Sequence, residues 1–389
     1  MGSKRTIALA FGLFFFWLLC ISILRNNLDL NVRLFNDDYD RSVYALRGEW
    51  YLNGQVPYRD TISEYPQVPT YLFAFPYILY HREMTQSIGY WLYSSQFSFL
   101  TLCLLFGTIT LLYQMLPKRQ WLALLMLLPA PLYFTYNRFD ILPAFLCLLS
   151  LFLLQKQRLI WSMIVLGIAT MSKWYPALLL PVYLSYTFSL RRSIDWRMIL
   201  TFFLTCLVIA APTLLAGGVK AFLTPYLFHA GRNLETISLP ALLFGAMQNW
   251  FGVVTIRSIW IDIFVVFQIL VAPFSFFDRI DNYDKVLYWN ILIVACFMLF
   301  ARIYSPQWLL WLMPMLILTA RTRLDIVWIV FYGIATYIGF PVVWDAGNMV
   351  ALQLMGFVNI VTIAHIAVLA FHRAHVHFTI KHLVKPHSG

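Results

Sequence analysis

The chain has 389 residues, of which 61% are hydrophobic and 12% are charged, and its mean hydropathy is +0.72. A soluble domain usually has about 25% charged residues, so this composition excludes a soluble globular protein. It predicts an all-α, polytopic integral membrane protein, because the apolar runs are long and unbroken and do not alternate as barrel strands do. The net charge is +11, but the basic residues cluster at the ends of apolar runs, where they mark topology, so we expect no nucleic-acid partner.

About twelve membrane-spanning helices are predicted, and the whole chain, 1–389, is expected to form a single transmembrane domain. In chain order the expected spans are 6–24, 88–115, 120–136, 139–155, 159–172, 174–189, 198–216, 259–277, 286–302, 305–320, 324–341 and 350–371. The first is expected to be a retained helix and not a signal peptide. Residues 68–80 and 239–250 are expected to be short interfacial or re-entrant helices, because counting them as spans would place basic clusters on the wrong face.

This arrangement places both termini in the cytoplasm and two large loops, 25–87 and 217–257, on the exoplasmic face. Most of the unusual polar residues then lie on that face. We expect a bacterial inner (plasma) membrane, since no eukaryotic retention signal is present, and an endoplasmic reticulum membrane with the same topology stays open.

Residues 36–66 are the most polar part of the first loop and hold six of the chain's 17 acidic residues. A membrane protein that concentrates carboxylates in this way is expected to carry out chemistry or ion binding there. Asp38 and Asp40 are two residues apart. In an extended segment their side chains would point the same way, and in a helix they would diverge by about 200°. A solvated acidic loop or a helix N-cap is the alternative interpretation of this pair.

The residues after Asp40 carry a resemblance to a known family. The pattern is an acid, then an aromatic residue four positions on, a glycine and a Pro-Tyr pair, and it reads Asp40, Tyr44, Gly54, Pro57 and Tyr58. It resembles the first exoplasmic loop of the GT-C superfamily of polyprenyl-phosphate-sugar-dependent glycosyltransferases. The closest likeness is to the DUF2029-type bacterial alpha-mannosyltransferases, and Asp38 and Asp40 match the DxD of the GPI first mannosyltransferase.

The resemblance extends to two further corners of the chain. Lys173-Trp174-Tyr175-Pro176 and the segment 304–311 are similar to motifs of these enzymes, whereas 136–140 departs from the Gly-Gln-x-Asn of many bacterial members. It implies a GT-C fold with an exoplasmic active-site loop. It also implies inverting transfer of a hexose, in the first instance mannose, from a polyprenyl-phosphate sugar to a glycolipid or glycan acceptor, as in glycolipid biosynthesis for the cell envelope.

The resemblance and the chemistry together assign expected roles. Asp40 is the expected general base, with Asp38 orienting the acceptor or holding the ionisation state of Asp40. The cations expected to bind the donor phosphate are Lys173, Arg232, His229 and Arg138. The expected substrate-lining residues are Tyr44, Tyr58, Glu64, Tyr65, Tyr304 and Gln307, and Glu64 is also the third choice for the base. Headgroup anchoring is the alternative for the cations, and membrane-interface packing is the alternative for the aromatic residues.

No metal or other cofactor is expected to be required, because a lipid phosphate is already an activated leaving group and no ligand cluster is visible in the sequence. Two other functions stay open at this point. A transporter or flippase of a lipid-linked intermediate would suit twelve spans, although such proteins usually show related halves. A noncatalytic membrane scaffold would not depend on Asp40.

Overall fold

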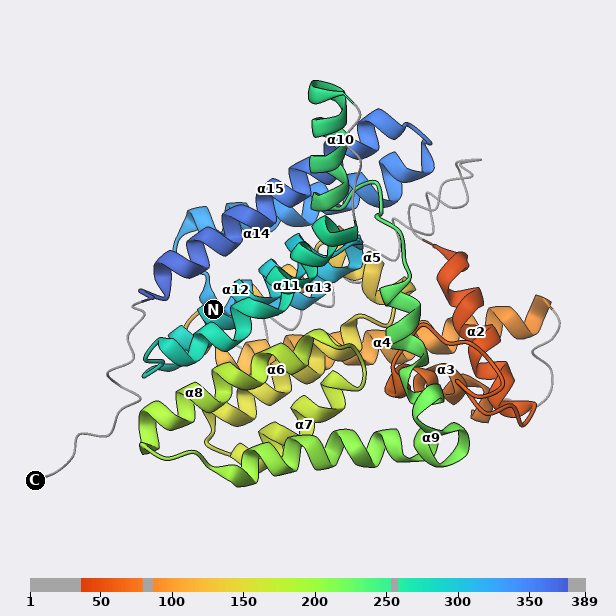
Figure 1. Ribbon diagram of the computed structural model, residues 1–389, viewed down its shortest axis with the longest axis horizontal. Coiled ribbons are helices and arrows are strands. Elements are labelled where there is room, and N and C mark those ends of the chain that lie inside the picture. The colour runs from red at the N-terminus through yellow and green to blue at the C-terminus, as the bar shows by residue number, and fades with distance from the viewer. Residues whose placement is uncertain (1–35, 80–86, 253–257, 377–389) are drawn as a thin grey trace, which may run out of the picture. The chain divides into compact units, whose positions relative to one another are not determined.

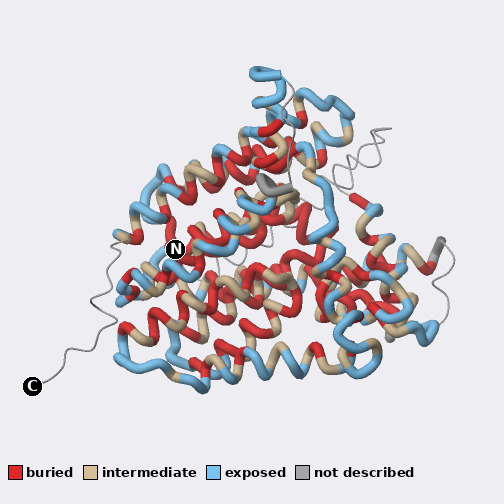
Figure 2. The backbone as a smooth tube through the Cα atoms, in the orientation of Figure 1, coloured by how far each residue is buried: buried red, intermediate tan, exposed pale blue. Residues whose placement is uncertain are grey.

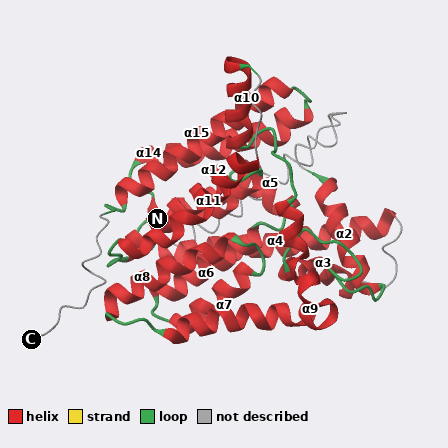
Figure 3. Ribbon diagram, viewed as in Figure 1, coloured by secondary structure: helices red, strands yellow, loops and turns green. Residues whose placement is uncertain are grey.

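The computed structural model describes residues 36–79, 87–252 and 258–376. Regular structure in these ranges is helical, apart from a single bridge between Pro57 and Thr61 (Figure 3). The all-α prediction is therefore confirmed for the described part of the chain. Figure 1 shows the described helices, coloured in chain order. The chain divides into two compact units. Unit 1 comprises 1–53, 71–145 and 306–355, and unit 2 comprises 54–70, 146–305 and 356–389.

Unit 1 is built around α13, whose side chains are buried on almost all sides. This helix packs against α14, α5, α4 and the 3₁₀ helix η1. A helix that is apolar all round belongs in the centre of a bundle, which explains this position. The elements that begin in unit 1 are α2 (Asp38–Leu52), α4 (Ser87–Met115), η1 (Gln120–Leu127), α5 (Pro129–Asn137), α6 (Ile141–Gln155), η4 (Pro306–Trp308), α13 (Leu309–Thr319), α14 (Arg323–Tyr337), the π-helical turn η5 (Ile338–Val343) and α15 (Met349–Arg373).

Unit 2 has a comparable centre in α12, which is buried along most of its length and packs against α11, α8 and α10. By contrast α9, which packs against α7, has many exposed residues (Figure 2). Among them are the apolar Leu207, Val208 and Leu215, which are all more than half exposed. Such a surface suits lipid and not water. The elements that begin in unit 2 are α3 (Gln67–Leu79), α7 (Leu159–Thr170), η2 (Tyr175–Leu179), α8 (Leu180–Arg191), α9 (Trp196–Ala230), α10 (Leu239–Phe251), α11 (Ser258–Phe274), η3 (Ser275–Phe277) and α12 (Tyr283–Phe300).

Within the described ranges, five helices are long and apolar enough to cross a membrane. They are Gly89–Met115, Trp196–Ala230, Tyr283–Phe300, Arg323–Val343 and Met349–Arg373. A sixth span is possible in the pair α5 and α6, which are bent by 112° at the break between them. The chain is thus an all-α membrane protein, and the total of about twelve spans stays a prediction. The expected first span, 6–24, lies outside the described residues.

Several expected spans differ from the helices observed. At the spans predicted over 159–172, 259–277 and 305–320, the apolar helices Leu159–Thr170, Asp262–Phe277 and Pro306–Thr319 are shorter than the candidate membrane spans. Residues 120–136 were predicted as one span, but η1 ends at Leu127 and α5 starts at Pro129. Leu128 between them is extended, with ψ 155°, as the residue before a proline prefers. The span predicted over 198–216 continues as α9 to Ala230, past a break at Gly218, whose φ of +67° is readily adopted only by glycine. The predicted loop 217–257 is consequently helical over much of its described length.

The predicted short helices at 68–80 and 239–250 are present as α3 and α10. Their location at a membrane surface stays a prediction. The predicted loop 25–87 holds α2 as well as α3, so the acidic segment begins as a helix and not as an extended chain.

Candidate functional site

The acidic segment of unit 1 forms the start of α2. Asp37 is the N-cap residue, and its carboxylate accepts a hydrogen bond from the backbone N–H of Tyr39 at 3.1 Å. Asp38 and Asp40 follow in the first helical turn, where the positive end of the helix dipole stabilises carboxylates. The N-cap alternative considered for Asp38 and Asp40 applies to neither of them, because the cap residue is Asp37. Because the segment is helical, the side chains of Asp38 and Asp40 diverge.

Arg138 lies between two of these carboxylates. It is the C-cap residue of α5, and its guanidinium forms ion pairs through Nη2 with Asp37 and through Nε with Oδ2 of Asp40, the latter at 2.7 Å. The side chains of Arg138 and Asp37 are 5% and 2% exposed, whereas that of Asp40 is 22% exposed. A backbone contact supports the arrangement, because the N–H of Asp37 donates to Oδ1 of Asn137 at 2.9 Å. We call these three charged residues the Asp37–Arg138–Asp40 cluster.

Tyr44 contributes its hydroxyl to this cluster. The hydroxyl lies 3.5 Å from Oδ2 of Asp40, one helical turn earlier, which is a long hydrogen bond. The ring itself is fully buried, stacks on Phe73 at 4.4 Å between centroids and meets Phe139 edge-on. Tyr44 therefore joins the aromatic core of unit 1 to the carboxylate of Asp40.

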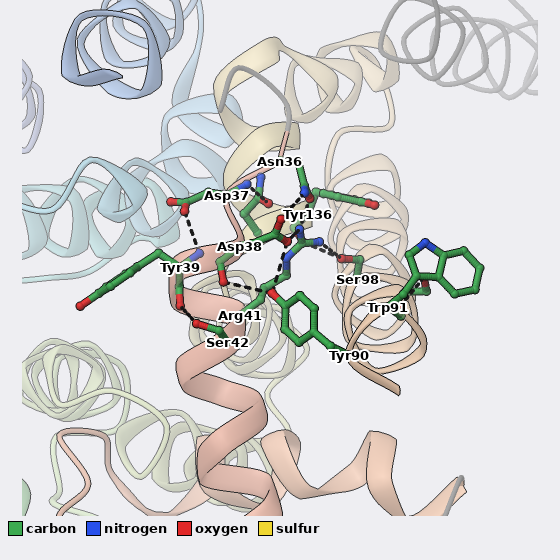
Figure 4. Close-up of polar contacts among 12 residues, drawn as sticks. Asn36, Asp37, Asp38, Tyr39, Arg41, Ser42, Tyr90, Trp91, Ser98 and Tyr136 are labelled. Carbon is green, nitrogen blue, oxygen red and sulfur yellow. Dashed lines mark hydrogen bonds and ion pairs between the residues drawn. The ribbon is translucent and has the colours of Figure 1, made fainter. Parts of the chain in front are cut away.

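Asp38 is held by a different arginine. The buried guanidinium of Arg41 contacts Oδ1 of Asp38 at 2.6 Å, Oγ of Ser98 at 3.2 Å and the side chain of Asn36, while Tyr90 donates its hydroxyl to Oδ1 of Asp38 at 3.2 Å (Figure 4). The Asp38 side chain is 54% exposed. Sequence reasoning did not single out Arg41. The available signal was its position three residues after Asp38, which is ion-pair spacing on a helix.

A second corner of unit 1 fixes the segment that carries Arg138. Asp140, fully buried, accepts a hydrogen bond at 3.0 Å from Nε1 of Trp311, and Trp311 stacks on Trp308 at 4.7 Å between centroids. The tryptophans belong to the predicted motif 304–311. They attach α13 to the break between α5 and α6, so their observed contacts are those of packing residues.

Unit 2 contains Lys173, which follows α7. Its Nζ lies 6.0 Å from the centre of the Tyr65 ring, within range of a cation–π contact. Both side chains are half-buried. The next residue, Trp174, stacks on Tyr226 of α9 at 4.7 Å between ring centroids. A cation and several aromatic side chains thus lie together in this part of unit 2.

His229, near the end of α9, extends this group. Its ring meets Trp174 edge-on at 4.8 Å, and its Nε2 lies 2.9 Å from the backbone carbonyl oxygen of Glu64. Glu64 is therefore held through its backbone in this contact. Arg232, two residues beyond the end of α9, is exposed. Of the cations predicted for the donor phosphate, Lys173 and His229 share a neighbour in Trp174, whereas Arg138 pairs with carboxylates in unit 1.

Three of the predicted substrate-lining tyrosines are buried. Tyr44 is in the core of unit 1, and Tyr304 is fully buried in unit 2. Tyr58 is also buried, and its hydroxyl donates to the carbonyl oxygen of Tyr65 at 2.7 Å and lies 2.9 Å from Oγ1 of Thr70. Gln307 is half-buried in unit 1. The contacts of these tyrosines stabilise the fold, and a direct role in lining the substrate stays a prediction.

No group of three or more His, Cys, Asp or Glu side chains that could hold a metal ion occurs in 36–79, 87–252 or 258–376. The family model for glycosyltransferase family 87 matches residues 65–306, which is more than half of the chain. No match was found among curated proteins. The matched range contains Arg138, Lys173 and His229, and it begins after α2, so Asp38 and Asp40 precede it.

Proposed function

The chain belongs to glycosyltransferase family 87, and from this premise we propose that it is an inverting, polyprenyl-phosphate-dependent hexosyltransferase. The sugar proposed in the first instance is mannose, and the acceptor is a lipid-linked or other glycan on the exoplasmic face. The observation that carries the proposal is the carboxylate of Asp40, which is partly exposed in an otherwise buried ion-paired cluster. A general base must be accessible to the acceptor and held in position, and the partial exposure of Asp40 and its ion pair with Arg138 support this role.

In the proposed reaction, Asp40 accepts the proton of an acceptor hydroxyl. The hydroxyl oxygen forms a bond to the anomeric carbon, on the face opposite the lipid phosphate. The bond between the anomeric carbon and the phosphate oxygen breaks, and its electron pair leaves with the polyprenyl phosphate. Attack from the opposite face inverts the anomeric configuration, so a beta-linked donor gives an alpha-linked product. No metal or other cofactor takes part in this scheme.

The leaving phosphate needs positive charge near apolar surface, and Lys173 is proposed to supply it. An ammonium group is a compact point charge that stabilises the negative charge developing on the phosphate oxygen. Tyr65 and Trp174 beside it offer aromatic surface for the sugar or for the first prenyl units. His229 is proposed to support this group, and Arg232 to attract the anionic donor at the exposed end of α9.

The experiment that tests the proposal measures transfer of radiolabelled mannose from polyprenyl-phosphate mannose into membrane glycolipids, with and without a chelator. Asp40→Asn keeps the volume of the side chain but removes the base, so transfer is expected to fall by about 100-fold or more. Asp195→Asn is a matched control. Asp195 is also an N-cap residue paired with arginine, at the start of α9, and it has no proposed role in transfer.

Wild-type transfer that persists in Asp195→Asn and is lost in Asp40→Asn would support the proposal, and transfer in the presence of the chelator would support metal independence. Full activity of Asp40→Asn would refute the assignment of the base. Transport of a labelled lipid across a sealed vesicle membrane, without transfer from any polyprenyl-phosphate sugar, would favour the transporter instead.

A further inference from the structure

We propose that Arg138 is a positioning residue for Asp40, anchored by Asp37, and that the Asp37–Arg138–Asp40 cluster binds no phosphate. This inference rests on the proposed role of Asp40 as the base. It gives Arg138 a different role from the donor-phosphate role expected from sequence. The distinction can be tested because the two roles change different kinetic parameters.

The first argument is charge. One guanidinium forms ion pairs with two carboxylates, so the cluster carries a formal net charge of −1. A phosphodiester brought to it would meet a net negative charge, which is unfavourable in a partly buried site. An arginine that binds phosphate needs its donors directed at the phosphate oxygens. Here Nη2 donates to the carboxylate of Asp37 and Nη1 donates to the backbone carbonyl oxygen of Asn137, while Nε lies 2.7 Å from Oδ2 of Asp40.

The second argument is burial. The Arg138 side chain is almost completely enclosed, and its guanidinium also lies 5.9 Å from the centre of the Phe340 ring. Asp37 is equally enclosed and is fixed by its capping bond to Tyr39 and by its backbone bond to Asn137. The outermost member of the cluster is Asp40. The carboxylate of Asp40 is therefore accessible to substrate. The guanidinium of Arg138 contacts it from the buried side.

The third argument concerns the ionisation of Asp40. The charged and titratable groups near it include Arg138 from the corner after α5 and the Tyr44 hydroxyl from the next turn of α2. Asp37 is paired with the same Arg138, Tyr133 of α5 interacts electrostatically with Asp37 and Arg138, and the more exposed Asp38 is paired with Arg41. A nearby cation favours the charged form of a carboxylate, and a nearby anion disfavours it. In this proposal Arg138 favours the charged form of Asp40, which is the form that accepts a proton. The negative charge of Asp37 opposes this effect.

The test compares pH profiles of kcat/KM for wild type, Arg138→Gln, Arg138→Lys and Asp37→Asn in the mannose-transfer assay. Arg138→Gln removes a cation beside Asp40, so the acid limb of the profile is expected to move to higher pH by about one pH unit or more. The kcat should be lower and the KM for the donor unchanged. In Asp37→Asn the acid limb is expected to move to lower pH, because an anion near Asp40 is removed. Arg138→Lys is expected to keep the wild-type acid limb with a reduced kcat, since a lysine retains the charge but not the bridging geometry.

Arg119→Gln is the control. Arg119 also belongs to unit 1, but it donates to the carbonyl oxygens of Ala320 and Arg321 and contributes nothing to the cluster, so its pH profile should match wild type. A raised donor KM in Arg138→Gln without a shift of the acid limb would overturn the inference and assign Arg138 to the donor phosphate. If Arg138→Gln does not accumulate in the membrane, the inference is tested by Asp37→Asn alone. An acid limb of Asp37→Asn that is unchanged or moves to higher pH overturns the inference. An inactive wild type would instead count against the proposed function.

Discussion

Three carboxylates within four residues of one another have three different environments. Asp37 is buried and caps α2, Asp38 is largely exposed, and Asp40 lies between these extremes. The difference follows from helix geometry, since successive side chains are separated by about 100° around the axis. The first turn of α2 thus presents one carboxylate to the interior of unit 1 and leaves two accessible to different degrees.

Lys173 provides the residue-scale prediction for donor binding. Lys173→Ala is expected to raise the apparent KM for the polyprenyl-phosphate donor about tenfold or more, because a charge-assisted hydrogen bond to the phosphate is lost. Titration of the donor at saturating acceptor measures this effect. Lys220→Ala removes an exposed lysine from α9 of the same unit and should leave both KM values unchanged. A change confined to the acceptor KM would contradict a phosphate contact by Lys173.

At the scale of elements, α2 lies close to the part of α3 that belongs to unit 1. A Cβ atom added to Gly48 would lie 2.2 Å from the backbone carbonyl oxygen of Phe73 and 2.9 Å from a ring carbon of Tyr77. The same contact is fixed by the Tyr77 hydroxyl, which donates to the carbonyl oxygen of Ala45 at 3.0 Å. Gly48 allows α2 to pack directly on the backbone of α3.

Gly48→Ala is expected to destabilise the protein by about 1–3 kcal/mol, because neither backbone can yield to the added methyl group without losing packing. Thermal unfolding in detergent measures the loss as a lower transition temperature. Gly245→Ala is the matched control, since a Cβ at this exposed position of α10 meets no atom within 4 Å. Alanine is the better helix former, so this control should be neutral or slightly stabilising. An equal transition temperature for wild type and Gly48→Ala would show that the two helices can separate at no cost.

Helices could be predicted from the sequence in most places, because long apolar runs are recognised from composition alone. Composition was not sufficient at 120–136, where Pro129 breaks a run that is largely apolar on both sides. The roles given to the site residues stay predictions. Asp38 and Asp40 were singled out by spacing, but the partners of these residues come from Arg41 and from Arg138, which is about 100 positions along the chain. Pairing at that distance depends on tertiary packing, which no local pattern encodes.

At the scale of the whole molecule, orientation in the membrane can be tested with single cysteines in a chain whose own five cysteines are replaced. Ile62 lies in the predicted first exoplasmic loop and is 65% exposed, whereas Lys118 belongs to an exposed basic cluster predicted to face the cytoplasm. A membrane-impermeant maleimide applied to intact cells is expected to label Ile62→Cys and to label Lys118→Cys only after permeabilisation. The reverse pattern would place the acidic segment on the cytoplasmic face and would refute exoplasmic transfer.

The contact between Trp311 and Asp140 has a consequence for the order in which the protein is made. Residues 36–145 leave the ribosome before the rest of the described chain, and they carry α2, Arg138 and the buried carboxylate of Asp140. The indole that donates to this carboxylate is synthesised 171 positions later, in the last of the sequence segments that make up unit 1. The corner that carries Arg138 therefore acquires this support only after all of the chain between 146 and 305 has been synthesised.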